Sequence, residues 1–593
     1  MNNTSSTSMR ILGLSSFKRD AAAVLLLDGQ VQAGIEERKL LRARTQGMPI
    51  TAIEHCMHSE GISWTDLDAV AIASQPLRGW LRRSWTRSKT AAFSFLANAY
   101  YEADDIGAAA QQLNHVRRLN QRVGAAKKIV NIDHHLCHAA SAFLCSPFER
   151  ALILTLDEEG DGRSGMLAIG DGNEIRTLRK IPFPHSLAWI YTLITNLVGF
   201  TPHEDEHKTQ WLSLEGSPDL KHIFLRMLRS SSEPFPHLDR SYFNRGLVGN
   251  VPFSNKFFQE CGLPSNVSEI SREQKKILAA SLQQACTELI TDLVEWARKR
   301  EGIEDVCFGG GLFQNTLLVS DLEKRLGLGR VFVPPAPGNT GCALGAGLWL
   351  WHGLGKKPRT GFAKDVFWGP KFREQDIKDV LDNCKARYAL HNTEDRKIDA
   401  AIQLLTSGKI VGWYQGATEF GPRALGHRSV LASPWAPYVK ENLNDFIKHR
   451  EWFRPFALAV REEDCAQYFD CSPLCASMNS LAWARPEASI LPDGLVFSGN
   501  RVRLQIVKQA TNPLFWRLLK RFGEYAPAPM LVNTSFNLFG EPLVVNPRDA
   551  VRSYYCSGLD AMVIGNFVLS KAGLAQVQPR SQAALQAGAN VLS

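Results

Sequence analysis

The chain has 593 residues, of which 45% are hydrophobic and 21% are charged, and its formal net charge is +9 at pH 7. This length exceeds what one ordinary hydrophobic core can hold, which predicts two large domains and excludes a wholly disordered protein. The 12 cysteines contain no C-x-x-C pair, so zinc-ribbon and paired-cysteine redox sites are excluded and reduced thiols are expected.

Neither export nor membrane insertion is expected. The N-terminal stretch MNNTSSTSMRILGL is polar and lacks the charged-then-apolar order of a signal peptide. The longest apolar run, residues 342–354, contains glycines and a histidine and is shorter than the roughly 20 apolar residues that a membrane-spanning helix needs. We therefore expect a cytoplasmic protein.

The first half of the chain repeats one pattern of strands. RILGLSS, AAAVLLLDG and QVQAGIEE predict three strands over residues 10–37, with a tight turn at Asp28 and Gly29, and AVAIAS predicts a fourth. A second copy begins with ALILTLDEEGDG at residue 151 and continues through residues 165–181, 306–315 and 331–335. Duplicated hairpins followed by helices indicate an α/β fold of the actin-like ATPase type, in which two similar halves flank a nucleotide.

A basic segment lies between the two copies. Residues 78–89 combine arginines and Lys89 with Trp80 and Trp85, a composition that also occurs in nucleic-acid-binding patches. The favoured interpretation is a solvated helical face with inward-packed tryptophans, because no recognised nucleic-acid-binding module accompanies the segment. A nucleic-acid partner is therefore not expected, and a homodimer is compatible with the sequence.

The segment DHHLCHAASAF predicts a metal site. His134 and His138 are four residues apart and share one face if the segment is helical, although such a pair can also be structural. Asp157 follows at the end of the next predicted strand and can complete the site. Histidine with carboxylate favours iron, manganese or zinc over calcium, which prefers oxygen ligands alone.

Glycine-rich turns follow several predicted strands, at residues 160–162, 309–311 and 337–347. Each could be a simple turn, but together they could bring backbone amides close to phosphate or adenosine. The candidate nucleotide-binding residues are Gly160, Gly310, Gly311, Asn315 and Gly338.

A domain boundary is expected in HGLGKKPRTG, which separates domain 1–358 from an α/β domain 359–593. The second domain holds a cation-rich cluster in GATEFGPRALGHRS, KHREWFRPFA, Arg503 and NTSFN. Arginine forks bind phosphate or carboxylate in pairs, which predicts a pocket for a phosphorylated, planar ligand. Surface salt bridges are the alternative, but the flanking Phe, Trp and Pro residues favour partial burial.

These motifs, together with HHLCHAA, resemble the NodU/CmcH/TobZ-type O-carbamoyltransferase family over residues 9–571. The resemblance implies a Kae-type, actin-like first domain and a YrdC-like second domain. It implies that carbamoyl phosphate and ATP, with Mg²⁺, give carbamoyl adenylate, whose carbamoyl group then passes to a hydroxyl of a small molecule such as a natural product. It also implies Fe(II) or another divalent transition metal.

The resemblance assigns residues in both domains. Carbamoyl phosphate would be bound by Arg423, Lys448, Arg454, Arg503, Asn533 and Ser535, of which Arg423, Lys448 and Arg454 would also stabilise the departing phosphate. The metal would be held by His134, His138, Asp157 and Asn339.

The sequence departs from the family in the first domain. Arg19 stands where a catalytic histidine is usual, and Asp20 is the nearest replacement because arginine cannot act as a base. Asn339 replaces a metal-binding aspartate and brings no charge, so metal affinity should be lower. Glu158 and Trp211 replace glycines. We therefore expect the activation of carbamoyl phosphate to be retained. The acceptor, an acidic or aromatic alcohol, is expected to differ from the acceptors of the family.

Three other functions share parts of the pattern. A tRNA threonylcarbamoyl-type enzyme shares both domain types, but the domain order and GPRALGHRS favour a small-molecule acceptor. A hydrogenase-maturation enzyme of the HypF type would carry paired C-x-x-C motifs, which are absent from the sequence. A non-catalytic nucleotide-binding relative would explain Arg19 and Asn339 but not the cations of the second domain.

Overall fold

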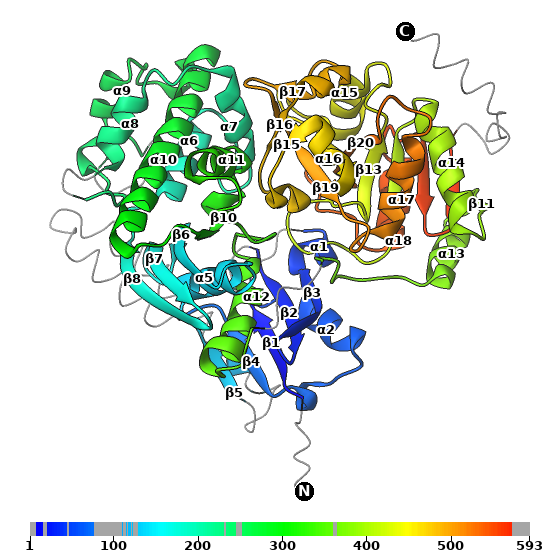
Figure 1. Cartoon of the computed structure of the whole chain (residues 1–593), viewed down its shortest axis with the longest axis horizontal. Helices are drawn as coiled ribbons and strands as arrows, with labels where there is room; N and C mark the ends of the chain where they lie inside the picture. Colours follow the sequence, from blue (N-terminus) through cyan, green and yellow to red (C-terminus); the bar gives the residue numbers. More distant parts are fainter. Residues whose placement is uncertain are drawn as a thin grey trace, which may run out of the picture. The chain divides into compact units, whose positions relative to one another are not determined.

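The computed structural model describes residues 8–15, 20–43, 47–75, 110, 114, 117–119, 121, 128–229, 233–244, 252–359 and 365–571. Arg19 and the basic segment 78–89 lie outside these ranges, so the predictions made for them stay predictions. The chain divides into two compact units: unit 1 comprises residues 1–37 and 45–363, and unit 2 comprises residues 38–44 and 364–593 (Figure 1).

Unit 1 contains two five-stranded sheets with the same topology. The first has the order β3-β2-β1-β4-β5 and the second the order β8-β7-β6-β9-β10. In each sheet the first three strands along the chain pair antiparallel and the last two join in parallel. The strands are β1 (Arg10–Leu14), β2 (Ala22–Leu27), β3 (Gln30–Glu36), β4 (Ala69–Ile72), β5 (Lys128–Asn131), β6 (Arg150–Gly160), β7 (Arg163–Asp171), β8 (Glu174–Pro182), β9 (Val306–Gly309) and β10 (Val331–Phe332).

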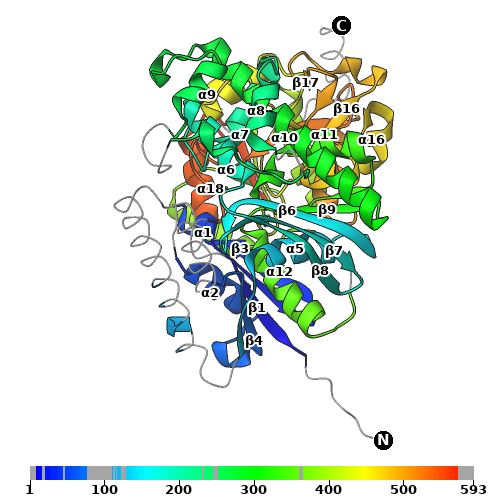
Figure 2. The same ribbon diagram turned by 90° about the vertical axis from the view of Figure 1, so that its left-hand side faces the viewer.

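The repeated five-strand order is the pattern on which the actin-like expectation was based, and it shows that unit 1 has an α/β fold. Helix α5 (His134–Leu144) packs on the second sheet and α12 (Gly341–Leu348) on the first, and the two helices pack against each other (Figure 2). Gly345 permits this approach, because a Cβ atom there would lie 1.9 Å from the Cys137 carbonyl oxygen. The α5–α12 layer therefore joins the two halves of unit 1.

The remaining helices of unit 1 surround this frame. The long helix α10 packs with α6, α7, α8 and α11. A capping box between Ser271 and Gln274 begins α10, and Gly302 in the left-handed conformation ends it. The bounds are α2 (Ile50–Ser59), α6 (Leu187–Leu197), α7 (Glu206–Leu212), α8 (Lys221–Leu228), α9 (Asn255–Glu260), α10 (Arg272–Glu301) and α11 (Thr316–Leu326).

Unit 2 is built on an eight-stranded mixed sheet with the order β11-β22-β21-β12-β13-β20-β14-β19, beside a four-stranded sheet with the order β15-β16-β18-β17. The strands are β11 (Ala389–Leu390), β12 (Val411–Tyr414), β13 (Arg428–Ala432), β14 (Ala457–Arg461), β15 (Phe469–Asp470), β16 (Ala482–Ala484), β17 (Val496–Phe497), β18 (Arg501–Val502), β19 (Leu504–Val507), β20 (Met530–Ser535), β21 (Ala561–Ile564) and β22 (Phe567–Ser570).

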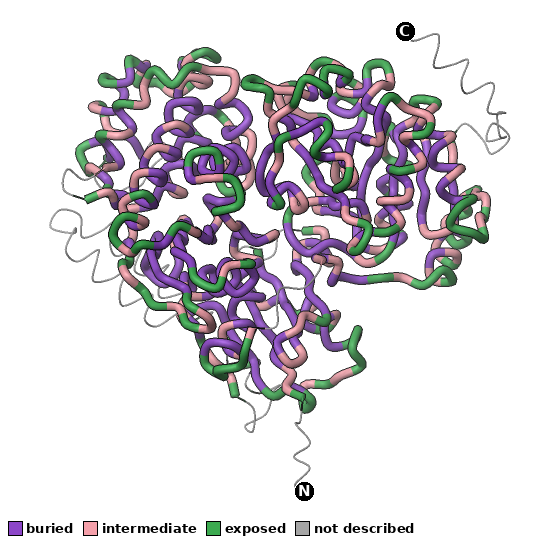
Figure 3. Tube along the Cα trace, in the orientation of Figure 1, coloured by how far each residue is buried: buried purple, intermediate pink, exposed green. Residues whose placement is uncertain are grey.

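Helices cover both faces of the large sheet, which is why its central strands are buried along their length (Figure 3). Helices α14 and α17 pack with Trp413 and Leu531 on one face, and α13 and α18 pack with Tyr414 and Val532 on the other. Neighbouring strand residues thus enter opposite cores, as strand geometry requires. The helices are α13 (Glu374–Asn383), α14 (Glu394–Thr406), α15 (Val439–Glu441), α16 (Glu462–Tyr468), α17 (Pro513–Phe522) and α18 (Pro547–Tyr555).

Residues 38–44, most of them in α1 (Glu37–Leu41), belong to unit 2 although they precede most of unit 1 in the chain. Lys39 is 7% exposed and its Nζ donates to the carbonyl oxygens of Glu419 and Gly421, each at 2.7 Å. Arg42 pairs with Glu541. The sequence did not indicate this assignment, because a division at residue 358 places the segment with the first domain.

Among the residues that the structure describes, no helix combines the length and the apolar composition that a bilayer crossing requires.

Candidate functional site

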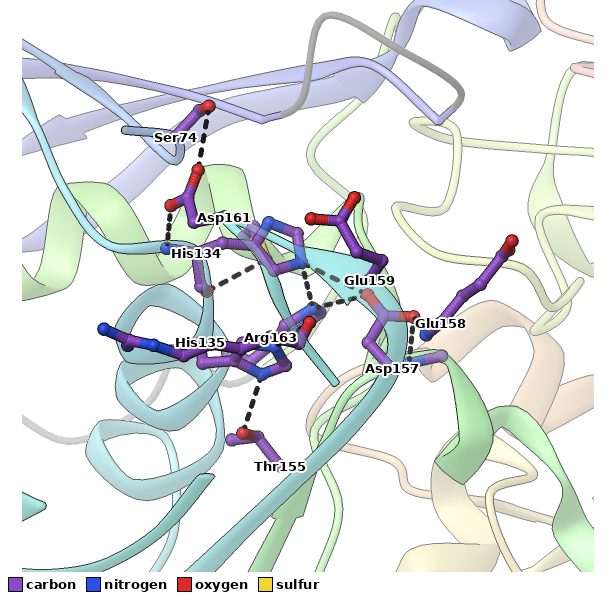
Figure 4. A network of polar contacts seen from close by, with 12 residues as sticks. Ser74, His134, His135, Thr155, Asp157, Glu158, Glu159, Asp161 and Arg163 are labelled. Carbon is purple, nitrogen blue, oxygen red and sulfur yellow. Dashed lines mark hydrogen bonds and ion pairs between the residues drawn. The ribbon is translucent and has the colours of Figure 1, made fainter. Parts of the chain in front are cut away.

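Three side chains of unit 1 converge on one point. His134 and His138 occupy the first two turns of α5, and Asp157 extends from β6 (Figure 4). The Nε2 atoms of the two histidines lie 3.1 Å apart, and each lies 3.1–3.2 Å from Asp157 Oδ2. The three residues that the sequence analysis selected are thus brought together, and all three are buried.

This triangle fits a divalent transition metal. Neighbouring ligands at right angles on a metal with bonds of about 2.1 Å are roughly 3.0 Å apart, close to the three separations observed. Two imidazole nitrogens at 3.1 Å also need a proton or a cation between their lone pairs. Two histidines and one carboxylate on one face are a donor set that suits iron(II) and leaves other positions open.

Two further groups belong to the surroundings of the triad. Cys342 on α12 places its sulfur in a group with His134 and His138 whose ligand atoms all lie within 4.8 Å of one another. Asn339 precedes that helix, and its buried Oδ1 has no hydrogen-bond partner in the structure. An oxygen atom without a hydrogen-bond partner is available to coordinate a metal ion, which fits the prediction made for Asn339. The sequence analysis missed Cys342, because a single cysteine outside a paired motif carries no metal signal.

Burial and mutual contact set the protonation of the triad. Burial alone would raise the pKa of Asp157, but its hydrogen bonds with His134 and His138 hold that pKa well below the usual range. Burial opposes charge on His134 too, yet Asp157 raises its pKa, whereas burial lowers the pKa of His138. A metal requires an ionised carboxylate and neutral imidazoles, so the shifts of Asp157 and His138 favour metal binding, whereas a bound ion would have to displace the proton that Asp157 favours on His134.

Backbone groups hold the carboxylate in place. Asp157 Oδ1 accepts from the backbone N–H of Glu158 at 2.9 Å and of Gly311 at 3.3 Å, which leaves Oδ2 to face the histidines. The Asp157 carbonyl accepts from Ser186 Oγ at 2.9 Å. Asp161, in the turn after β6, accepts from the backbone N–H of His134 at 2.9 Å and so fixes the start of α5.

Two of the four predicted nucleotide-binding glycines, Gly160 and Gly311, lie against this triad. A Cβ atom on Gly160 would lie 1.9 Å from the His134 ring, and one on Gly311 would lie 2.8 Å from Asp157 Oδ1. Gly310 has a φ of +105°, and a Cβ there would meet the Leu156 carbonyl at 2.1 Å. A Cβ on Gly338 would meet Gln314 at 2.1 Å. Close packing is thus sufficient reason for these glycines, and their contact with a nucleotide stays a prediction.

Two other predicted residues have structural surroundings of their own. Asn315 Oδ1 caps α11 by accepting from Leu318 N–H at 3.0 Å, and its Nδ2 donates to Gln283 Oε1 at 2.8 Å. Its side chain is therefore engaged within the protein, and only its backbone remains for a nucleotide. Asp20 is exposed, has a φ of +59°, and its carbonyl accepts from Ser15 Oγ. Its role as a base stays a prediction.

Unit 2 gathers five cations in one place. Lys448 is 6% exposed, and its Nζ donates to Asn537 Oδ1 at 2.7 Å, to Ser535 Oγ at 3.4 Å and to the Ser535 carbonyl. The others are Arg423, Arg450, Arg454 and Arg503. Arg450 and Arg454 act electrostatically on Lys448, and Arg503 feels the charges of Arg423, Arg450 and Arg454.

Positive charge in this cluster exceeds its negative charge. Burial and neighbouring arginines hold the pKa of Lys448, Arg450 and Arg503 well below their usual ranges, and lower that of Arg423 to about 10. A carboxylate, that of Glu451, lies 3.7 Å from Arg454. A cluster of five partly or fully buried cations suits a polyanionic ligand, whose negative charge interacts with several of them at once.

Arg450 is a member that the sequence analysis did not select. Its Nε donates to Asn444 Oδ1 at 2.8 Å and its guanidinium lies 4.0 Å from the centre of the Phe456 ring. The motif KHREWFRPFA contained it, but nothing in the spacing distinguished Arg450 from Arg454.

Side-chain amides and one buried carboxylate shape the loop that carries Arg423. Glu419 is fully buried, and its Oε1 accepts from the backbone N–H groups of Leu425, His427 and Arg428 at 2.9–3.0 Å. Asn533, 1% exposed, donates to the Ala424 carbonyl at 3.2 Å. Asn533, predicted to bind ligand, thus holds the loop through its amide nitrogen, and sequence reasoning missed Glu419 because its partners are backbone groups.

Both halves of the chain are similar to known carbamoyltransferase sequences. Residues 10–348 match the family described as carbamoyltransferase N-terminus, and residues 402–571 match carbamoyltransferase C-terminus. An uncharacterized protein of Synechocystis is 30% identical, with 95% of this chain and 96% of the relative covered. Nodulation protein NolNO of Sinorhizobium fredii is 31% identical over 94% of this chain and 80% of its own.

A 3′-hydroxymethylcephem-O-carbamoyltransferase of Streptomyces clavuligerus is 27% identical over 60% of this chain and 61% of its own. The residues matched by the two family models include the candidate metal triad in unit 1 and the cation cluster in unit 2. Together with the first two relatives, of which 96% and 80% are covered, they show that this chain belongs to the carbamoyltransferase family.

Proposed function

We propose that this chain is an ATP-dependent O-carbamoyltransferase that forms carbamoyl adenylate from carbamoyl phosphate and ATP and passes the carbamoyl group to a hydroxyl of a small molecule. The observation that carries the proposal is the cluster of five cations in unit 2. Carbamoyl phosphate and the triphosphate of ATP are polyanions of the kind that such a cluster would bind.

In the first step, water cleaves carbamoyl phosphate into carbamate and phosphate. Arg423, Lys448, Arg454 and Arg503 would hold the phosphoryl oxygens and stabilise the charge that grows as phosphate departs. A carbamate oxygen then attacks the α-phosphorus of ATP, supplied with Mg²⁺, and pyrophosphate leaves. Ser535, beside Lys448, offers a hydroxyl that can orient the carbamoyl group.

In the second step, carbamoyl adenylate is consumed in unit 1, where the acceptor hydroxyl attacks the carbonyl carbon and AMP leaves. His134, His138 and Asp157 would hold Fe(II) or a similar divalent ion, with Asn339 as a further oxygen donor. Such an ion, when bound, neutralises phosphate charge and polarises the reacting group. The glycine-rich turns would accommodate the nucleotide, and the acceptor is proposed to be an acidic or aromatic natural-product alcohol.

The test separates the two steps. The protein is mixed with ATP, carbamoyl phosphate and Mg²⁺, and pyrophosphate release is measured. Mass spectrometry then monitors a panel of alcohols for addition of a carbamoyl group. We expect Arg423→Ala to abolish pyrophosphate release and His134→Ala to impair transfer more selectively. The proposal is abandoned if the wild-type protein releases no pyrophosphate.

A further inference from the structure

A second histidine–carboxylate pair lies at the end of the strand that carries Asp157. His203 Nδ1 lies 2.9 Å from Glu158 Oε2, and the two side chains are 31% and 40% exposed. Glu158 extends from the strand away from His134 (Figure 4). The pair is therefore separate from the metal donors and accessible to a small molecule.

The local backbone fixes both members of the pair. The N–H of Glu158 donates to Asp157 Oδ1 at 2.9 Å, which ties its position to the triad. His203, between α6 and α7, has a φ of +65°, a conformation that costs a residue with a side chain about 1–2 kcal/mol. Its N–H donates to Glu206 Oε1 at 2.6 Å, and the same oxygen accepts from Thr192 Oγ1 at 2.9 Å. These bonds hold the strained residue with its ring toward Glu158.

The pairing gives the imidazole a defined chemical role. With the Glu158 carboxylate 2.9 Å from Nδ1, the tautomer that carries its proton on Nδ1 is favoured, and Nε2 then carries the basic lone pair. The histidines of the triad cannot serve in this way, because their Nε2 atoms face each other and Asp157.

We propose that His203 accepts the proton of the acceptor hydroxyl during carbamoyl transfer, with Glu158 as its positioning residue. The inference rests on the proposed function and adds a base to its second step. As the hydroxyl oxygen bonds to the carbamoyl carbon, its proton moves to His203 Nε2, and the bond from that carbon to the phosphate oxygen breaks. The electron pair of that bond leaves with AMP, and the imidazolium then loses its proton to water.

The experiment uses methanol as a small probe acceptor with the full chain, ATP, carbamoyl phosphate, Mg²⁺ and Fe(II). Methyl carbamate and pyrophosphate are both measured, and their ratio reports the transfer step alone. We expect His203→Ala to lower the ratio about 100-fold, the size typical of a lost general base. Added imidazole should restore a large part of it in His203→Ala, and Glu158→Gln should give a smaller loss that imidazole does not repair.

Matched variants make the outcome specific. His222→Gln changes an exposed histidine on α8 and should leave the ratio unchanged. Asp20→Asn tests the base that the sequence suggested. An unchanged ratio in His203→Ala, or a loss that imidazole does not repair, overturns the role of His203, as does a 100-fold loss in Asp20→Asn with His203→Ala unaffected. Absence of pyrophosphate from the wild-type protein contradicts the proposed function instead.

Discussion

The candidate sites of the two units differ in how their charge is balanced. In unit 1, Asp157 is bonded through both oxygens, to two imidazoles and to two backbone N–H groups. In unit 2, Lys448 donates to carbonyl, hydroxyl and amide oxygens, and Arg450 and Arg454 act on it electrostatically. The first site needs only a cation between its nitrogens, whereas the second needs an anion that brings several negative charges.

This difference predicts that the two sites respond oppositely to loss of a charged side chain. Removing the carboxylate of unit 1 takes away the group that organises the histidines. Removing one cation of unit 2 takes away function while relieving repulsion between buried charges. Loss of a charged side chain should therefore lower both activity and stability in unit 1, whereas in unit 2 it should lower activity without lowering stability.

The largest effect is expected for Asp157→Asn. Asparagine keeps the acceptor at Oδ1 but loses the charge at the metal, so divalent-metal affinity should fall at least about 100-fold. Metal content measured by mass spectrometry after dialysis should drop, and carbamoyl transfer should be lost while pyrophosphate release persists. Asp171→Asn, at an exposed strand end with its side chain 68% exposed, is the control and should retain metal. Equal metal content in the two variants would contradict the assignment.

Arg503→Met should separate function from stability. Loss of one charge that stabilises the departing phosphate should lower pyrophosphate release by about 100-fold or more. Without an anion, the melting temperature should stay the same or rise, because a partly buried cation beside other arginines has been removed. Arg517→Met removes an arginine paired with Glu394 and should leave release unchanged. A large fall in melting temperature would show that Arg503 is balanced within the protein.

Sequence spacing was sufficient for the parts of the sites that depend on local periodicity. Two histidines four residues apart must share a helix face, and Asp157 at a strand end could be expected to reach them. The repeated strand hairpins likewise predicted the duplicated sheets of unit 1. These features follow from the periods of helix and strand alone.

Features that depend on distant partners could not be read from the sequence. Asn315 fits a helix cap as well as a ligand, and only the structure shows that its oxygen caps α11. Glu419 acts on backbone N–H groups that leave no sequence signal. His203 meets Glu158 only because the loop before α7 returns to the end of β6.

A third change tests the packing on which the triad relies. In Gly160→Ala the new Cβ would lie 1.9 Å from the His134 ring, so either the ring or the strand end must move. Such overpacking typically costs about 1–3 kcal/mol of unfolding free energy, measured by denaturant titration, and should lower metal content. Gly540→Ala is the control in unit 2, where the space is open but φ is +74°. It should lose some stability and keep the metal.

The smallest effect concerns the binding of inorganic phosphate to the cation cluster of unit 2. Phosphate should raise the melting temperature by a few degrees, since saturation at about 100 times the dissociation constant stabilises by about 2.7 kcal/mol. Phosphate binding should raise the lowered pKa of Lys448, so the protein takes up protons as it binds. The increase in melting temperature should therefore become smaller as pH rises through the range below 10.5, the ordinary pKa of lysine. Thermal scans of the wild-type protein and of Lys448→Met, with chloride at equal ionic strength as the control, measure it. If phosphate and chloride change the melting temperature alike, or if Lys448→Met keeps the full increase with phosphate, the charges of these cations are balanced within the protein. The cluster would then need no anionic ligand, and the contrast in charge balance with the triad of unit 1 would be lost.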